Sequence, residues 1–104
     1  YMVHLVVTTI VKKGKMEEYL RECRKVRPLV LAEKGCVEYT FVRDIPSHLS
    51  IQENIHPDRV VLIEKWETME DLAAHGKAPH MKEFGSRAAV LRDSISAVVA
   101  ETAV

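Results

Sequence analysis

The sequence predicts an α+β fold in which four antiparallel strands carry helices on one face. Short runs rich in β-branched residues alternate with stretches whose apolar residues recur at helical spacing. Their order along the chain is β, α, β, β, α, β, which is the ferredoxin-like order. The length of 104 residues suits one hydrophobic core, so residues 1–104 are predicted to form a single domain.

The first half of the chain is predicted to form a strand, a helix and a second strand. VHLVVTTIV is short and rich in β-branched residues, and GKMEEYLRECRKV places its apolar residues on one helical face. Pro28 lacks an N–H and is expected to kink or restart this helix. Gly35 is placed to end it, and CVEYTFVRD then alternates so that Val37, Tyr39 and Phe41 share one side.

The second half of the chain begins with a long connection. The segment 45–59 has no clear period and contains two prolines, so it is predicted to be a loop between two strands. RVVLIEKW follows as a strand, and TMEDLAAHG follows as a helix with Thr68 as its N-cap. Pro79 can open another helix, and SISAVVAET closes the chain as a strand.

Both faces of the predicted sheet carry apolar residues. The strand RVVLIEKW places Val60 and Leu62 on one side and Val61 and Ile63 on the other. Helices can cover only one face, and an exposed apolar sheet of roughly several hundred Å² is unusual for a monomer. The pattern therefore predicts a homodimer in which the sheet of a second copy covers the free face.

The charge balance and the motif content of the sequence give no support to nucleic-acid binding, membrane insertion or cofactor binding. Lys plus Arg equals Asp plus Glu at 15 each, so nucleic-acid binding is not expected, and no apolar run is long enough to cross a membrane. Without a signal-peptide pattern, the predicted location is cytoplasmic. The sequence has no GxGxxG, GxxxxGK[ST], GxSxG or CxxC motif, and neither a metal nor an organic cofactor is predicted.

Glu64 and Trp66 are the strongest candidate site residues. On a strand they point to the same side, which places a carboxylate in line with an apolar face and an indole. A half-buried carboxylate has a raised pKa and can move a proton near neutral pH. The alternative for Glu64 is a rim position paired with Arg43 or Arg59, and the alternative for Trp66 is ordinary core packing.

His75 and His80 lie on one short segment and could face one cavity. Histidine titrates near neutral pH, so either residue is a candidate general acid or base. The spacing does not suit a metal site, because it is not HxxxH on one helix and no Cys or Asp completes a set. The alternatives are that His75 interacts with free carbonyls at a helix C-terminus and that His80 caps a helix start.

Tyr39 and His4 are candidate substrate-binding residues. Tyr39 could donate a phenolic hydrogen bond into the pocket, although its neighbours Val37 and Phe41 also suit core packing. His4 alternates with apolar residues on the first strand, where a lone histidine is more often a satisfied core or interface group.

These residues resemble a known family. Gly35-Cys36 with Tyr39 three residues on, followed by LIEKWETMEDLAAHGKAPHMKEF, is similar to the small antibiotic biosynthesis monooxygenase proteins, whose pattern is roughly EpGc..Y, an E.W strand, then L..H....H...F. The resemblance covers most of the chain. It implies a dimeric α+β barrel, built from two ferredoxin-like sheets packed together.

The resemblance also implies a reaction. Oxygenase members of the family oxidise a quinol or anthrone-like small molecule with O₂ without flavin or metal. Carried over residue by residue, His75, Glu64 and His80 are expected to be catalytic, with His75 or Glu64 as the base and Trp66 as the wall on which a flat substrate stacks. Thr8 and Thr9 stand where the haem-degrading branch has an Asn, so haem turnover is not expected.

Two other functions remain open from the sequence. The same residues could serve an isomerase or epimerase of a small carbonyl sugar phosphate, in which case cationic groups such as Arg43 or Arg87 should line the pocket. The chain could also be a non-catalytic binding module for a hydrophobic metabolite. That reading requires an apolar pocket, Glu64 turned to solvent and both histidines capping helices.

Overall fold

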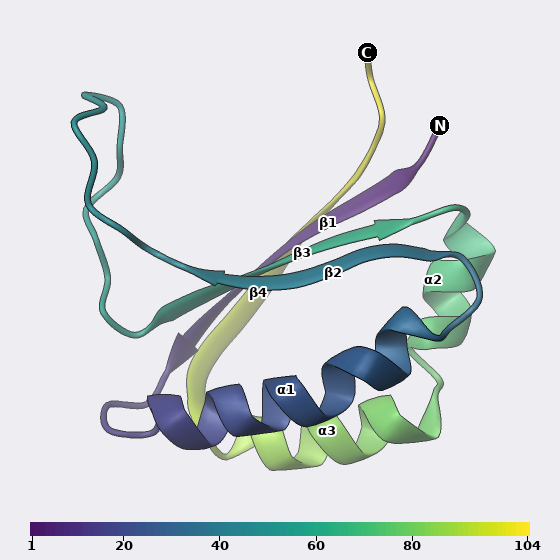
Figure 1. The fold of residues 1–104 in the computed structure, drawn as a ribbon, viewed down its shortest axis with the longest axis horizontal. Helices are drawn as coiled ribbons and strands as arrows, with labels where there is room; N and C mark the ends of the chain where they lie inside the picture. The colour runs from purple at the N-terminus through teal and green to yellow at the C-terminus, as the bar shows by residue number, and fades with distance from the viewer.

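The computed structural model describes residues 1–104 and shows an antiparallel sheet with helices on one face (Figure 1). The predicted α+β fold is confirmed, and both helices expected between the third and fourth strands are present. In chain order the elements are β1 (Val3–Val11), α1 (Met16–Leu31), β2 (Cys36–Arg43), β3 (Arg59–Trp66), α2 (Met69–His75), α3 (Pro79–Ala89) and β4 (Arg92–Glu101).

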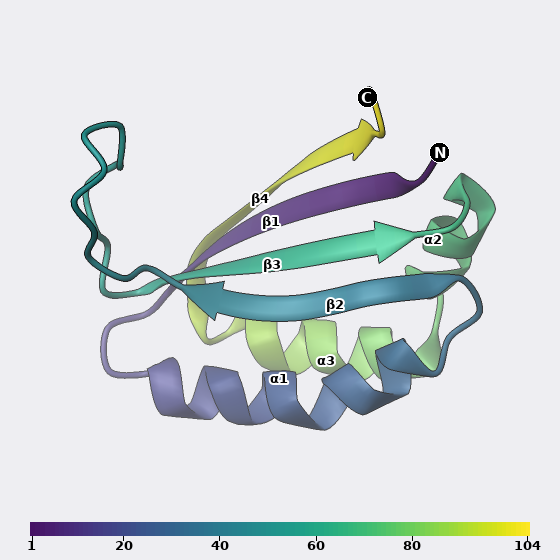
Figure 2. The ribbon, with the colours of Figure 1, turned by 45° about the horizontal axis from the view of Figure 1, so that its top comes forward.

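The strand order in the sheet is β2-β3-β1-β4, and every neighbouring pair is antiparallel. Helices α1 and α3 lie side by side beneath one face, and α2 lies near the end of β3 (Figure 2). The register pairs Leu5 with Glu64 and Val7 with Leu62. The side chains of Val60, Leu62, Glu64 and Trp66 therefore all point toward the helices.

Helix α1 continues through Pro28 to Leu31, so the expected restart at Pro28 is wrong. The proline lies in the last turn of the helix, where its missing N–H removes only one intrahelical hydrogen bond. The N–H of Ala32 still reaches the carbonyl of Pro28, at 3.3 Å. A proline so near a helix end removes too little hydrogen bonding to break the helix.

A β-bulge at the start of β2 changes which side chains face the helices. Cys36 pairs with Trp66 while Glu38 pairs with Lys65, so two steps along β2 oppose one step along β3. Val37 is therefore exposed, and its predicted place beside Tyr39 and Phe41 is wrong. Strict alternation fails here because the bulge adds one residue to one strand only.

The core between the sheet and the helices consists of two adjacent apolar clusters. The first cluster contains Val3, Val26, Val30, Tyr39, Leu62 and Trp66. The second contains Val11, Tyr19, Cys23, Val60, Ala88 and Leu91. Phe41 and Phe84 pack against both clusters, so aromatic side chains from β2 and α3 join them into one layer.

The opposite face of the sheet is open. Val6 is 44% exposed and its cross-strand neighbour Val98 is 63% exposed. The edge strand β4 is also uncovered on its helix side, where Ile95 and Val99 are more than half exposed. Apolar side chains thus face outward on this sheet, as the sequence pattern requires, while the homodimer itself stays a prediction. None of the three helices is long and apolar enough to cross a membrane.

Candidate functional site

A cavity of about 130 Å³ lies between the sheet and the helices. Its walls are mainly apolar and aromatic, with Tyr39 and Phe41 from β2 and Met81 and Phe84 from α3. The polar residues that line it, apart from two tyrosines, are Thr9, Glu64 and Arg92. A small aromatic ligand would meet flat hydrophobic surfaces and a few polar groups, as is typical of small-molecule sites.

Glu64 is the buried carboxylate of this cavity, with only 4% of its surface exposed. The indole Nε1–H of Trp66 donates a hydrogen bond to its Oε1 at 2.9 Å. Burial raises the pKa of Glu64 above its ordinary value, while the Trp66 hydrogen bond and nearby His75 oppose the rise. The sequence-based alternative of an arginine-paired rim residue does not hold, because Arg59 pairs with Asp44 instead.

Trp66 holds the Glu64 carboxylate by its indole hydrogen bond. It is fully buried and does not line the cavity, so the indole is no surface for a ligand in this conformation. Its ring lies 4.7 Å from the ring of His75, at an interplanar angle of 36°. The indole therefore fixes two polar side chains, Glu64 by a hydrogen bond and His75 by packing.

His75 lies next to Glu64 but does not line the cavity. Its Nε2 is 3.9 Å from Oε1 of Glu64, and its Nδ1 is 2.8 Å from Oε2 of Glu33. An ionised carboxylate only accepts hydrogen bonds, so Nδ1 donates to Glu33 and the second ring nitrogen faces Glu64. This side-chain contact with Glu33 stands in place of the alternative considered from the sequence, in which His75 interacts with free helix carbonyls.

Glu33 is the residue that sequence reasoning missed. The same atom, Oε2, binds His75 and also Nε2 of His80 at 2.7 Å. Glu33 lies after the end of α1, while the two histidines belong to α2 and α3. Glu33 lies two residues before Gly35, in EKGC, and so matches the Glu that begins the family pattern EpGc..Y. This match is the sequence feature that could have identified Glu33 as a site residue.

Gly35 allows these elements to meet. Its φ is +79°, a left-handed conformation that glycine adopts without steric cost. A Cβ at this position would overlap the carboxylate of Asp71 on α2. The absence of a side chain therefore lets α2 approach the turn before β2, which brings His75 within reach of Glu33.

Tyr39 lines the cavity and is almost fully buried. Its ring meets Phe41 and His75 edge to face, with centroid distances of 5.4 and 5.5 Å. Burial, followed by the charges of Glu64 and Glu33, raises the pKa of its hydroxyl. Tyr39 therefore stays neutral at physiological pH.

His4 is not part of this cluster. It lies on the opposite, open face of β1, where its Nε2 is 2.8 Å from the hydroxyl of Thr102. Of the six residues selected from the sequence, the structure brings together Tyr39, Glu64, Trp66, His75 and His80, while His4 lies apart.

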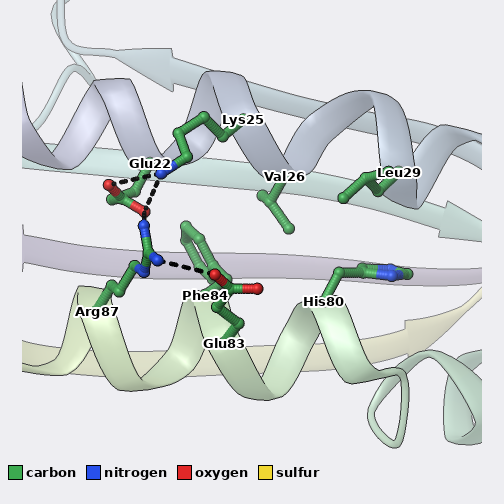
Figure 3. A pocket seen from close by; sticks show the side chains of 8 residues that line it. All are labelled: Glu22, Lys25, Val26, Leu29, His80, Glu83, Phe84 and Arg87. Atoms are coloured by element: carbon green, nitrogen blue, oxygen red, sulfur yellow. Dashed lines mark hydrogen bonds and ion pairs between the residues drawn. The ribbon is translucent and has the colours of Figure 1, made fainter.

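A second hollow is an outer groove of about 320 Å³ between α1 and α3 (Figure 3). Val26 and Leu29 from α1 face His80 and Phe84 from α3. Phe84 lines both this groove and the inner cavity, so its ring stands between the two spaces. The charged residues of the groove pair with one another, as Arg87 does with Glu22 and Glu83.

The remaining ionisable groups suggest no additional centre. No group of three or more His, Cys, Asp or Glu residues has an arrangement that could hold a metal ion. Both cysteines are free, and burial raises the pKa of the Cys23 thiol to about 12, which leaves it unreactive at neutral pH. Glu64, His75 and His80 are the side chains near the cavity whose chemistry suits proton transfer.

Comparison with known proteins bears on this site. The profile of the antibiotic biosynthesis monooxygenase family matches residues 2–87. The chain is 40% identical over 65 residues to the "Probable quinol monooxygenase YgiN" of Escherichia coli (strain K12). That alignment covers 62% of this chain and 62% of the relative, so the match spans less than two thirds of either protein.

Solved structures show the same fold. A conserved protein from Methanosarcina mazei Go1 superposes with a TM-score of 0.85 at 19% identity, covering 98% of this chain and 93% of that one. PA3566 from Pseudomonas aeruginosa superposes with a TM-score of 0.81 at 22% identity, covering 99% and 95%. At these identities the similarity concerns the fold alone.

Proposed function

The chain belongs to the antibiotic biosynthesis monooxygenase family, and on that premise we propose that it oxidises a quinol or anthrone-like small aromatic molecule with O₂. The observation that carries the proposal is the buried Glu64, which lines an aromatic cavity and has His75 behind it. A carboxylate with a raised pKa in an apolar site is suited to take a proton from a phenol.

Glu64 is the base in this proposal, because it lines the cavity and His75 does not. It removes a proton from a phenolic hydroxyl or an acidic ring C–H, and the resulting electron-rich anion reduces O₂. One oxygen atom enters the substrate at the reacting carbon and the other leaves as water, while the substrate supplies all four electrons. The reaction so written needs neither a flavin nor a metal.

The cavity walls support an aromatic substrate. Tyr39, Phe41 and Phe84 offer ring faces and edges to a flat ligand. Arg92 lines the same cavity, and its guanidinium makes no hydrogen bond or ion pair within the chain. Tyr19 lines the same cavity, and the charge of Arg92 opposes the rise that burial causes in the pKa of Tyr19. A free cation there would stabilise the substrate anion.

Arg92 also favours a second candidate, an isomerase of a small anionic carbonyl compound. Its free guanidinium could hold a phosphate while Glu64 and His75 move a proton through an enediol. Arg43 and Arg87, which the sequence suggested for that role, are engaged elsewhere with Pro57 and with Glu22 and Glu83. The binding-module alternative has no such support, because Glu64 is buried and both histidines contact Glu33.

The proposed assembly is a homodimer through the open sheet face. Val6 and Val98 are cross-strand neighbours whose side chains remain largely exposed on this face. A second copy of the sheet would remove this apolar surface from water, which favours association.

Oxygen uptake tests the proposal. The protein, stripped of metal and flavin, is assayed in an oxygen electrode with a panel of hydroquinones and anthrones, alongside a no-enzyme autoxidation control. Uptake above autoxidation is expected, with kcat lowered on the order of 10²-fold in Glu64→Gln and His75→Asn. Glu17→Gln, on the exposed side of α1, is the matched control and should behave as wild type. No uptake with any substrate would refute the oxygenase and leave a sugar-phosphate isomerisation assay as the test of the second candidate.

A further inference from the structure

Four side chains form a continuous line from the inner cavity to the outer groove. Glu64 Oε1 is 3.9 Å from His75 Nε2, and His75 Nδ1 is 2.8 Å from Glu33 Oε2. The same oxygen is 2.7 Å from Nε2 of His80, which lines the groove. The exposed side-chain fraction rises along this line from 5% at Glu64 through 7% and 15% to 22% at His80.

From this geometry we propose that Glu33 and His80 form, with His75, a proton path that connects Glu64 to water in the groove between α1 and α3. The inference rests on the proposed function, because it assumes that Glu64 gains and loses protons during turnover. It adds two residues, Glu33 and His80, that act on the reaction without touching the substrate.

Each step of the path transfers one proton. Protonated Glu64 gives its proton to Nε2 of His75, and the ring releases its Nδ1 proton to Oε2 of Glu33. His80 exchanges with groove water and can carry its hydrogen on Nδ1, in which tautomer its Nε2 accepts the proton from Glu33. His80 then releases its Nδ1 proton to water. The reverse sequence returns a proton to Glu64.

The burial of Glu64 makes such a path useful. With 4% of its surface exposed, the carboxylate has little direct contact with bulk water. Phe84 stands between the cavity and the groove, so the apolar ring blocks the direct route. The histidines and Glu33 pass around it.

Two titratable groups beside the path, Cys36 and Tyr39, do not compete as proton carriers. Burial, with the charges of Glu33 and Glu64, raises the pKa of both Cys36 and Tyr39, so both stay protonated. Arg27 donates its Nε–H to the carbonyl of Tyr39. The titratable or charged side chains near the path include Arg27 from α1, Cys36 and Tyr39 from β2, and Asp71 from α2, which lies against Gly35; Lys25 and Glu83 line the groove with His80.

Exchange of the His75 ring hydrogen with water tests the path without any substrate. The Nδ1–H of His75 is observed by NMR, and its rate of exchange with water is measured in wild type and His80→Gln. Glutamine can still donate a hydrogen bond to Glu33 but cannot take up and release protons. We expect exchange to slow at least about tenfold in His80→Gln and to stay unchanged in Glu83→Gln, a control on the same groove. Equal exchange in wild type and His80→Gln would overturn the path.

Turnover provides the second test. In His80→Ala, kcat should fall about tenfold or more with little change in KM, and added imidazole should restore it because the groove admits a small proton carrier. Glu33→Gln should lose activity without rescue by imidazole. A wild-type enzyme that turns over while His80→Ala retains full kcat, or loses it without rescue, contradicts the path. If the wild-type protein shows no turnover, the proposed function fails. The proton path is then tested by the hydrogen-exchange experiment alone.

Discussion

At the scale of single residues, the site depends on a carboxylate placed where its charge is poorly solvated. Glu64 lies in a strand whose neighbours on the same face are Leu62 and Trp66, and it has one hydrogen-bond donor, the indole. Burial favours its protonated form, and the imidazole of His75 limits how far this goes. A carboxylate balanced in this way can accept a proton and return it.

The stability of the fold should therefore depend on Glu64 in a defined direction. Its folded-state pKa lies above the ordinary value of 4.5, so the folded protein binds more protons than the unfolded chain as pH rises from about 4.5. The free energy of unfolding should fall with rising pH across that window, until the folded-state pKa is passed. Glu64→Gln keeps an acceptor for Trp66 and should remove this fall.

Urea unfolding between pH 4 and 8, followed by the fluorescence of the single tryptophan, measures the effect. The difference in stability between Glu64→Gln and wild type should grow in favour of the variant as pH rises. Glu17→Gln should show a constant difference from wild type. A Glu64→Gln difference that is equally constant would mean that the folded protein ionises Glu64 freely.

At the scale of elements, the site depends on how the turn between α1 and β2 meets α2. Thr68 caps α2, accepting a hydrogen bond from the N–H of Asp71 at 3.0 Å, and this fixes where the helix begins. The Asp71 carboxylate then lies against Gly35. Helix α2 has only seven residues, so its position depends on these contacts more than on its own hydrogen bonds.

Gly35→Ala tests this contact, and Gly14→Ala is its matched control. Both glycines have a φ near +80°, but a Cβ at Gly14 meets nothing within 4 Å, whereas one at Gly35 overlaps Asp71. Gly14→Ala should cost about 1 kcal/mol from backbone strain alone, and Gly35→Ala should cost at least about 2 kcal/mol. Urea unfolding gives both values. Equal costs would show that Asp71 moves away freely.

At the scale of the whole molecule, the two sheet faces have different roles. One face carries the helices and the cavity, and the other presents apolar side chains to solvent. β4 is exposed on both faces along nearly its whole length, which is unusual for an apolar edge strand in an isolated domain. The proposed dimer accounts for the open face.

Val98→Lys should disrupt that dimer. The residue is 63% exposed on the open face, and a lysine there would place a charge inside the proposed interface. Analytical ultracentrifugation of wild type should give twice the chain mass of 11.8 kDa, and Val98→Lys should shift the population to monomer. Val90→Lys, at an exposed apolar position after α3, should remain dimeric. A monomeric wild-type protein would refute the proposal outright.

Much of the fold could be predicted from the sequence because it depends on local patterns. Alternation in RVVLIEKW determined that Glu64 and Trp66 share a face with Val60 and Leu62, and Thr68 and Pro79 marked the starts of the two short helices. These signals reflect backbone geometry within a few residues and need no knowledge of distant segments. The bulge at Val37 was not predicted, because one inserted residue changes the alternation of side chains without a local sequence signal.

The candidate site required the tertiary structure. Glu33 contacts His75 and His80 across 42 and 47 residues of chain, and no periodicity relates positions so far apart. Likewise, only packing decided that Trp66 is enclosed and that His4 faces away from the cavity. The sequence by itself determined the elements and the side of each strand that carries reactive groups. Which of those groups meet was decided by the packing of α2 and α3 against the end of α1, because contacts between distant segments depend on the whole fold.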